Sequence, residues 1–128
     1  MRIYKCPIST ALEYIGKKWT FEIVRDLFFG KIHFNEFLES NPNLSGKVLS
    51  ERLKELRDDG IIEKKVSNTF PVSVEYELTP KGRALNKILY ELAVFAMNFC
   101  EEFNEAKKDN SSCVLVLDTL KKALNIQE

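Results

Sequence analysis

Leucine spacing organises the middle of the chain. Leu49, Leu53 and Leu56 recur at intervals of four and three residues, which places them on one face of a helix. Ser45 can accept hydrogen bonds from the first turn of that helix, and Gly60 can take the left-handed conformation that ends it. The pattern predicts a helix over residues 45–59.

A hairpin is predicted directly after this helix. Apolar and polar residues alternate over 62–66 and again over 74–78, as in strands, and a turn is predicted between Asn68 and Pro71. A short helix followed by a two-stranded hairpin is the arrangement of a recognition helix and its wing. The helix would enter the major groove of DNA, and the wing over 62–79 would lie on the backbone.

Three shorter helices are expected before residue 45. Cys6 to Ser9 should be an extended lead-in, because Pro7 disfavours helix at Cys6. Thr10 and Glu13 have capping-box spacing and predict a helix that ends near Gly16. A second helix is expected from Lys17 to Gly30 and a third over 34–38. The residues expected to face inward are Leu12, Ile15, Trp19, Ile23, Val24, Leu27, Phe28, Phe34, Phe37 and Leu38.

One long helix is expected after the hairpin, with Thr79 as its cap and Pro80 in its first turn. Its apolar residues keep helical spacing for roughly five turns, as far as Phe103. A stripe of that length is more than a small domain can cover, so we expect a dimer interface; packing within the chain is the alternative. The expected interface residues are Leu85, Ile88, Leu89, Leu92, Phe95 and Phe99.

Two conformations are consistent with the pattern of the last segment. Residues 107–112 are polar and predict a break, and an apolar segment from Cys113 to Leu120 follows. That segment is either a helix ending near Leu124 or a strand. The expected fold is therefore mainly α (α+β): a winged helix-turn-helix domain over 1–83, and a C-terminal helical dimerisation element over 84–128 that also uses the N-terminal helix.

Composition narrows the class of protein. The 128 residues are 45% hydrophobic and 30% charged, with a net charge of zero, which argues against a polycation that holds DNA by bulk attraction. No apolar run approaches the ~20 residues of a membrane span, and the N-terminus lacks the apolar core of a signal peptide. We therefore expect a cytoplasmic protein without a membrane partner.

The sequence offers no catalytic constellation. The sequence contains no pattern typical of a nucleophile with its base, of a metal-ligand cluster or of a phosphate loop. We therefore expect no enzyme, no cofactor and no metal. The three cysteines are scattered and odd in number, which fits neither a disulfide framework nor a zinc site. His33, the single histidine, precedes a helix, where capping or surface exposure is expected.

The candidate DNA-contacting residues lie opposite the leucine face of the 45–59 helix. Lys47, Ser50 and Glu51 are expected to meet base edges, and Lys54 and Arg57 to hold phosphates. The free N–H groups at the predicted helix starts near Ser45 and Thr10 suit a phosphate, and Gly46 is a further candidate contact. Arg52 lies at the edge of the apolar stripe. The wing candidates are Lys64, Lys65, Asn68, Thr69 and Ser73. The alternative is that these charged residues only form a solvent-exposed helix face, with ion pairs such as Glu51–Lys54 and pairing among Glu51, Glu55 and Arg52.

Several short motifs occur in one order along the chain. They are Cys6-Pro7, Gly16-Lys17-Lys18-Trp19, Phe34-Asn35-Glu36-Phe37, Ser45-Gly46-Lys47-Val48-Leu49-Ser50, Asp59-Gly60-Ile61-Ile62, Val74-Glu75-Tyr76-Glu77-Leu78-Thr79 and Lys81-Gly82. Over about residues 6–100 the chain resembles the HxlR-type transcriptional regulators, a winged-helix group related to MarR. The resemblance implies a homodimer that binds double-stranded operator DNA as a repressor or activator. Two departures are Lys17, where the family usually has glycine, and residues 104–128, which extend past the pattern.

The resemblance also gives Cys6 a candidate role. Some members sense quinones, aldehydes or oxidants through a cysteine near the N-terminus, and Cys6 matches that position. A thiolate there would be favoured by Lys5, and by Lys17 or Lys18 if they come close. The alternative is a small packed residue, as expected for Cys100 and Cys113. A winged-helix module that docks on a protein is a further reading, and the sequence does not specify an effector.

Overall fold

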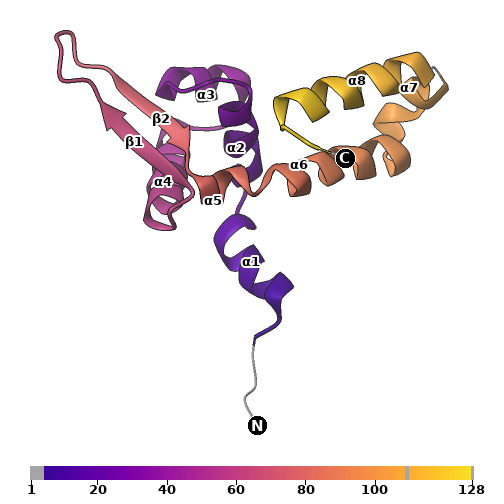
Figure 1. The fold of residues 1–128 in the computed structure, drawn as a ribbon, viewed down its shortest axis with the longest axis horizontal. Coiled ribbons are helices and arrows are strands. Elements are labelled where there is room, and N and C mark those ends of the chain that lie inside the picture. Colours follow the sequence, from indigo (N-terminus) through magenta and orange to yellow (C-terminus); the bar gives the residue numbers. More distant parts are fainter. Residues whose placement is uncertain (1–4, 109, 128) are drawn as a thin grey trace. The chain divides into compact units, whose positions relative to one another are not determined.

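The structure, a computed structural model, describes residues 5–108 and 110–127. The chain divides into two units, one up to Gly82 and the other from Arg83. The first unit holds α1 (Pro7–Ile15), α2 (Thr20–Phe28), α3 (Phe34–Ser40), α4 (Gly46–Asp58), β1 (Ile62–Val66) and β2 (Val74–Leu78), and α5 (Pro80–Arg83) spans the boundary (Figure 1). The second unit holds α6 (Asn86–Phe99), a 3-10 turn at Glu101–Phe103, α7 (Asn104–Lys108) and α8 (Asn110–Ala123). This is the predicted mainly helical fold with a two-stranded antiparallel sheet.

The predicted leucine stripe forms the centre of the first unit's core. Leu49, Leu53 and Leu56 of α4 are almost fully buried, which confirms the expected face of the helix. Phe37 of α3 is also buried, and its ring packs edge-on against Tyr76 of β2 with centroids 6.3 Å apart. The other buried hydrophobic residues of this unit are Ile15, Ile23, Val24, Leu27, Leu44, Ile61, Ile62 and Leu78.

Both ends of α4 follow the predicted chemistry. Ser45 is its N-cap, and the Ser45 Oγ accepts a hydrogen bond of 3.1 Å from the Val48 N–H. Beyond the other end, Gly60 has a φ of +73°, where a side chain would be strained. The helix therefore starts and stops within a residue of the expected positions.

The hairpin is fixed to the rest of the unit at its base. β1 and β2 are antiparallel, with Ile62 opposite Leu78 and Val66 opposite Val74. The Tyr76 N–H donates to the Ile32 carbonyl at 2.9 Å, which ties β2 to the segment before α3. Gly82 packs directly against the base of the hairpin, so closely that a Cβ at this position would overlap the Ile61 carbonyl oxygen. The base is thus buried, while the strands extend outward from the helices (Figure 1).

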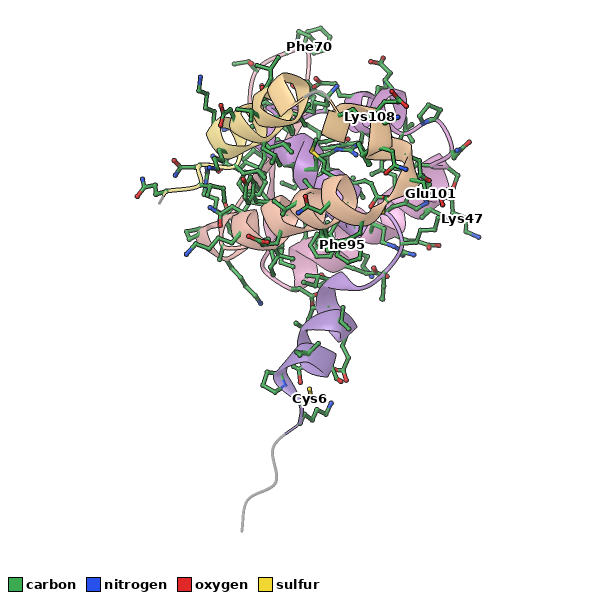
Figure 2. All side chains as sticks on the ribbon, turned by 90° about the vertical axis from the view of Figure 1, so that its right-hand side faces the viewer. Cys6, Lys47, Phe70, Phe95, Glu101 and Lys108 are labelled. Atoms are coloured by element: carbon green, nitrogen blue, oxygen red, sulfur yellow. The ribbon has the colours of Figure 1, made fainter. Side chains whose placement is uncertain are left out.

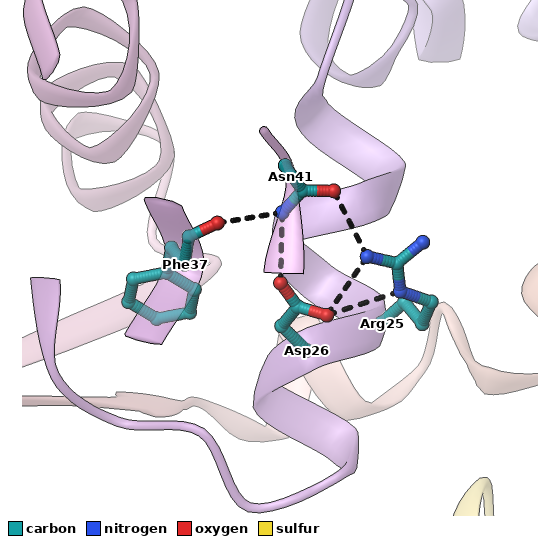
Figure 3. A network of polar contacts seen from close by, with 4 residues as sticks. All are labelled: Arg25, Asp26, Phe37 and Asn41. Carbon is teal, nitrogen blue, oxygen red and sulfur yellow. Dashed lines mark hydrogen bonds and ion pairs between the residues drawn. The ribbon is translucent and has the colours of Figure 1, made fainter. Parts of the chain in front are cut away.

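A buried polar network holds the turn between α3 and α4 (Figure 3). The Asn41 side-chain amide donates to Asp26 Oδ2 at 3.0 Å and to the Phe37 carbonyl at 2.8 Å. The Asn41 Oδ1 accepts from Arg25 at 3.0 Å, and Arg25 forms an ion pair with Asp26 at 2.9 Å. Because Asp26 and Arg25 belong to α2, the network fixes that helix to the helix-turn-helix corner.

The N-terminal boundaries differ from the prediction. α1 begins at Pro7 and not at Thr10, since proline suits the first helical turn, and the Thr10 hydroxyl donates to the Cys6 carbonyl at 3.0 Å. The expected extended lead-in is therefore wrong from Pro7 onward. Leu12, expected to face inward, is 55% exposed in the single chain. α2 begins at Thr20, after Trp19 in a left-handed conformation.

The predicted single long helix after the hairpin is wrong. α5 ends at Arg83, and α6 begins only at Asn86 and ends at Phe99. The Asn86 side chain accepts from the Lys87 N–H at 2.8 Å and donates to the Leu124 carbonyl at 2.9 Å. The first bond is local to the start of α6, and the second holds it against Leu124, the residue after α8, an interaction that helical periodicity does not reveal.

The last segment is helical. α8 runs over Asn110–Ala123, so the helix alternative is the right one and the strand alternative is wrong. The polar break expected over 107–112 is also mostly helical, because α7 includes Lys108 and α8 starts at Asn110; residue 109 lies outside the described residues. Across 5–108 and 110–127, each helix is too short or too polar to cross a membrane.

Candidate nucleic-acid interface

α4 presents a charged face opposite its buried leucines. Lys47, Ser50, Glu51, Lys54 and Arg57 are all exposed, as the spacing predicts, and Lys47 extends into solvent (Figure 2). In the described part of the chain, no ion pair involves Lys47, Lys54 or Arg57. The Glu51–Lys54 pair of the alternative reading is therefore not formed, although Arg52 and Glu55, which that reading also included, pair at 3.5 Å. The three cations remain available for an anionic partner.

The start of α4 offers backbone donors. Helix geometry leaves the first N–H groups without intrahelical acceptors, and the Ser45 hydroxyl satisfies only that of Val48. Apart from the adjoining backbone of α4 itself, the nearest atoms to a Cβ on Gly46 would be those of the Phe34 ring at 4.0 Å, so the backbone is open on that side. The start of α4 therefore has backbone donors that suit a phosphate, and a contact at Ser45 and Gly46 stays a prediction. The phosphate site predicted near Thr10 is wrong, because Thr10 lies inside α1 and its N–H donates to the Cys6 carbonyl at 2.9 Å.

Arg52 and Glu55 fix α4 in place from its flank. The Arg52 Nε donates to the Lys18 carbonyl at 2.9 Å, and the Glu55 carboxylate pairs with Lys17 at 3.1 Å. Both residues are half-buried. Arg52 thus packs at the edge of the stripe, as expected, and holds the exposed face of α4 in one orientation.

The predicted wing residues fall into two groups. Lys64, Asn68 and Thr69 are exposed, and Lys64 has no ion pair within the described ranges. Lys65, in contrast, pairs with Glu77 at 2.8 Å, and the hydrogen bond and charge of Glu77 raise the pKa of Lys65. The Ser73 carbonyl accepts from the Ser67 N–H at 2.8 Å, which closes the tip loop. Lys64 is thus the freer of the two wing cations.

The tip of the wing also carries a residue that the prediction left out. Phe70 is 96% exposed, more than any other large hydrophobic side chain in the described residues. The available signal was an aromatic residue inside a polar turn. Analysis of hydrophobic periodicity assigns aromatic residues to the core and therefore does not single out Phe70 as a surface residue.

α6 carries an apolar stripe on its surface. Ile88, Leu92, Phe95 and Phe99 are exposed at helical spacing, with Phe95 at 61% and Phe99 at 74%. The Phe95 and Phe99 rings pack against each other with centroids 5.5 Å apart. A groove of about 450 Å³ runs beside Ile88, Leu92 and Phe95. Leu85 and Leu89, also predicted, are half-buried.

Cys6 lies immediately before α1, and its side chain is exposed. Hydrogen bonds from the Ser9 and Ile8 N–H groups, and then from the Ser9 hydroxyl, lower the pKa of the Cys6 thiol. The lysines expected to help have other partners: Lys5 pairs with Glu13 at 3.4 Å and Lys17 with Glu55. Cys100 is half-buried, and the side chain of Cys113 lies outside the described ones.

Comparison with known proteins identifies the group of regulators that this arrangement resembles. The model of the HxlR-like helix-turn-helix family matches residues 14–104. The HTH-type transcriptional regulator YodB of Bacillus subtilis is 41% identical over 97 residues, which cover 75% of this chain and 87% of YodB. The HTH-type regulator YvaP of the same organism is 42% identical over 97 residues, covering 75% of this chain and 90% of YvaP.

Solved structures agree with the sequence relatives. The redox regulator HypR in its reduced form superimposes with a TM-score of 0.71 at 31% identity, covering 78% of this chain and 99% of that one. The crystal structure of the putative HTH-type regulator ytcD superimposes with a TM-score of 0.68 at 38% identity, covering 73% and 96%. The chain therefore belongs to the HxlR-like helix-turn-helix family and is a winged-helix, DNA-binding transcriptional regulator.

Proposed function

We propose that the protein acts in the prokaryotic cytoplasm as a homodimer on operator DNA, with α4 in the major groove. The observation that carries the proposal is the face of α4 that bears Lys47, Lys54 and Arg57 without ion pairs while its leucines anchor the helix. Residues at the start of a recognition helix usually reach base edges, so Lys47 and Ser50 read sequence and Lys54 and Arg57 hold phosphates. The proposal includes no catalytic step.

Replacing Lys47 with alanine should weaken operator binding by about thirtyfold or more, because the dimer loses one contact to a guanine edge in each half-site, each worth ~1–3 kcal/mol. The duplex is one that the wild type selects from a random pool, and affinity is measured by fluorescence anisotropy. Discrimination against a scrambled duplex should fall together with affinity.

Lys122→Ala is the matched control, because it removes one exposed charge from α8 outside the proposed interface. It should bind as the wild type does. If Lys47→Ala binds the selected duplex unchanged, or loses affinity equally for selected and scrambled duplexes, Lys47 does not read bases.

The homodimer rests on the exposed apolar stripe of α6. Monomers rarely leave a contiguous apolar patch of this kind in water, and a second copy can cover it with the same stripe. α8 of the same unit also exposes Val114, Leu115 and Val116, and α1 of the first unit separately exposes Ile8 and Leu12. A dimer would present two copies of α4 to two half-sites of an operator.

Thiol sensing by Cys6 is a second candidate function, favoured by its exposure and by the lowered pKa of its thiol. A lowered pKa means more thiolate at neutral pH, so Cys6 should react with iodoacetamide faster than Cys100, with a rate that levels off at a lower pH than for an ordinary thiol. Mass spectrometry at pH 6 to 9 measures both rates.

The link to DNA is tested with the same reagent. Alkylated wild type should differ from untreated protein in operator affinity, whereas alkylation should leave the operator affinity of Cys6→Ser unchanged. A Cys6 that reacts no faster than Cys100, or a Cys6→Ser variant that responds like the wild type, would remove the sensing role.

A further inference from the structure

The tip of the wing has no charge with which to bind phosphates. Residues 67–73 read Ser-Asn-Thr-Phe-Pro-Val-Ser, without an ionisable side chain. What the tip presents to solvent is Phe70, which is almost fully exposed, and Val72, which is 65% exposed. Phe70 therefore contributes nothing to the packed core, and an apolar side chain of this kind is the type that DNA-binding proteins insert between base steps.

The tip loop is closed by its own hydrogen bonds. The Ser67 N–H donates to the Ser73 carbonyl at 2.8 Å, and the Thr69 N–H donates to the Ser67 Oγ at 3.1 Å. The Ser67 and Thr69 hydroxyls are 2.8 Å apart. Phe70 follows this closed turn, and its ring lies at the outer end of the loop (Figure 2). The loop thus presents the ring in a defined place.

The two faces of the hairpin differ in charge. One face carries Glu63, Lys65, Glu75 and Glu77, and its single lysine is paired with Glu77. Phosphates repel such a face. The other face is buried at its base and continues outward through Lys64, Val66 and Val74. The hairpin therefore suits an approach to DNA by its end and by the Lys64 face, not by the acidic side.

We propose that Phe70 enters the minor groove beside the major groove occupied by α4 and wedges against a base step. The five residues of β1 carry the tip loop roughly 16 Å along the strand from the base of the hairpin, a reach greater than the ~6 Å width of the minor groove. Apolar side chains inserted in this way partly unstack the step and kink the duplex. The inference rests on the proposed placement of α4.

The neighbours of Phe70 fit the floor of that groove. Asn68 and Thr69 are exposed hydrogen-bonding residues beside the ring, and A·T pairs offer only acceptors there. Pyrimidine–purine steps such as TA unstack most readily. Phe70 therefore favours an A·T-rich flank outside the bases that α4 reads.

The test compares Phe70→Ala with the wild type on the selected duplex, with 2-aminopurine placed at successive flanking positions. Phe70→Ala should lower the affinity of the dimer about thirtyfold or more, because one aromatic contact to a base, worth ~1–3 kcal/mol, is lost in each half-site. The slope of log affinity against log salt should stay unchanged, because no charge is lost. The rise in 2-aminopurine fluorescence on wild-type binding should disappear.

Phe29→Ala is the matched control, since Phe29 is an exposed phenylalanine at the end of α2, outside the wing. It should leave affinity and fluorescence unchanged. Melting temperatures check that both variants fold, and an exposed tip residue should not affect folding.

The other outcomes distinguish a failure of the Phe70 wedge from a failure of the placement of α4 in the major groove. If Phe70→Ala binds normally while Lys47→Ala is weakened, the wedge is wrong and α4 still reads the groove. If neither variant is weakened, the placement of α4 fails as well. If Phe70→Ala is weakened but wild-type binding raises no 2-aminopurine signal, the ring rests on the backbone and does not wedge.

Discussion

Replacing Phe95 with glutamate should convert the protein from a dimer to a monomer. Phe95 is 61% exposed in the single chain and lies in the middle of the α6 stripe, with Leu92 and Phe99 beside it. A two-fold interface contains each residue twice, so one substitution removes two rings, each worth ~2–3 kcal/mol when buried, and inserts two charges. The loss of at least ~5 kcal/mol raises the dimer dissociation constant by more than about a thousandfold.

Sedimentation velocity over a range of concentrations measures this change. Phe29→Glu makes the same chemical change on an exposed phenylalanine of the first unit and should stay dimeric. A wild type that is monomeric at high concentration, or a Phe95→Glu variant that remains dimeric, would contradict the assignment of the α6 stripe. Leu115→Glu on α8 then shows which apolar surface a second copy uses, if any.

Loss of the dimer should also reduce operator binding. A monomer has one α4 and gains nothing from the second half-site, so the advantage of linked binding is lost. Phe95→Glu should therefore weaken binding more than Lys47→Ala does, although Phe95 contacts no DNA in the proposal. Comparing the two variants distinguishes residues that contact operator bases from residues that hold the two protomers together.

The elements that the sequence predicts well are those set by local chemistry. α4 is defined by three leucines, a serine cap and a glycine stop, all within sixteen residues, and the structure agrees at both ends. The hairpin is likewise defined by alternation and a polar turn. Lys47, Lys54 and Arg57 are exposed for the same reason, because helical spacing decides which residues face away from Leu53.

The elements predicted poorly depend on contacts between distant residues. The break between α5 and α6 involves Asn86 and the end of α8, almost forty positions further along the chain. The ion pair of Lys65 with Glu77 depends on strand register, which alternation alone leaves open. Phe70 is not among the predicted wing contacts, because sequence pattern assigns apolar residues to the core and nothing local shows that a ring at the end of a hairpin has no neighbours.

Replacing Asn41 with alanine should lower the free energy of unfolding by about 3 kcal/mol, among the largest effects of any single polar residue in the first unit. The substitution removes the bonds to Phe37 and Arg25 and leaves an oxygen of buried Asp26 without its donor. Hydrogen bonds to charged groups contribute ~1.5–3 kcal/mol, and an unsatisfied buried carboxylate adds a penalty.

Thermal and urea unfolding followed by circular dichroism measure the loss, with Asn43→Ala as the matched control. Asn43 lies in the same turn but is exposed, so its replacement should change stability by less than ~0.5 kcal/mol. Because Asn41 links α2 to the corner that leads into α4, the Asn41 variant should also bind the operator more weakly at temperatures where it stays folded. Equal stability of the two variants would mean that the corner is held by its apolar contacts alone, with Leu44 and Phe37 sufficient to place the recognition helix.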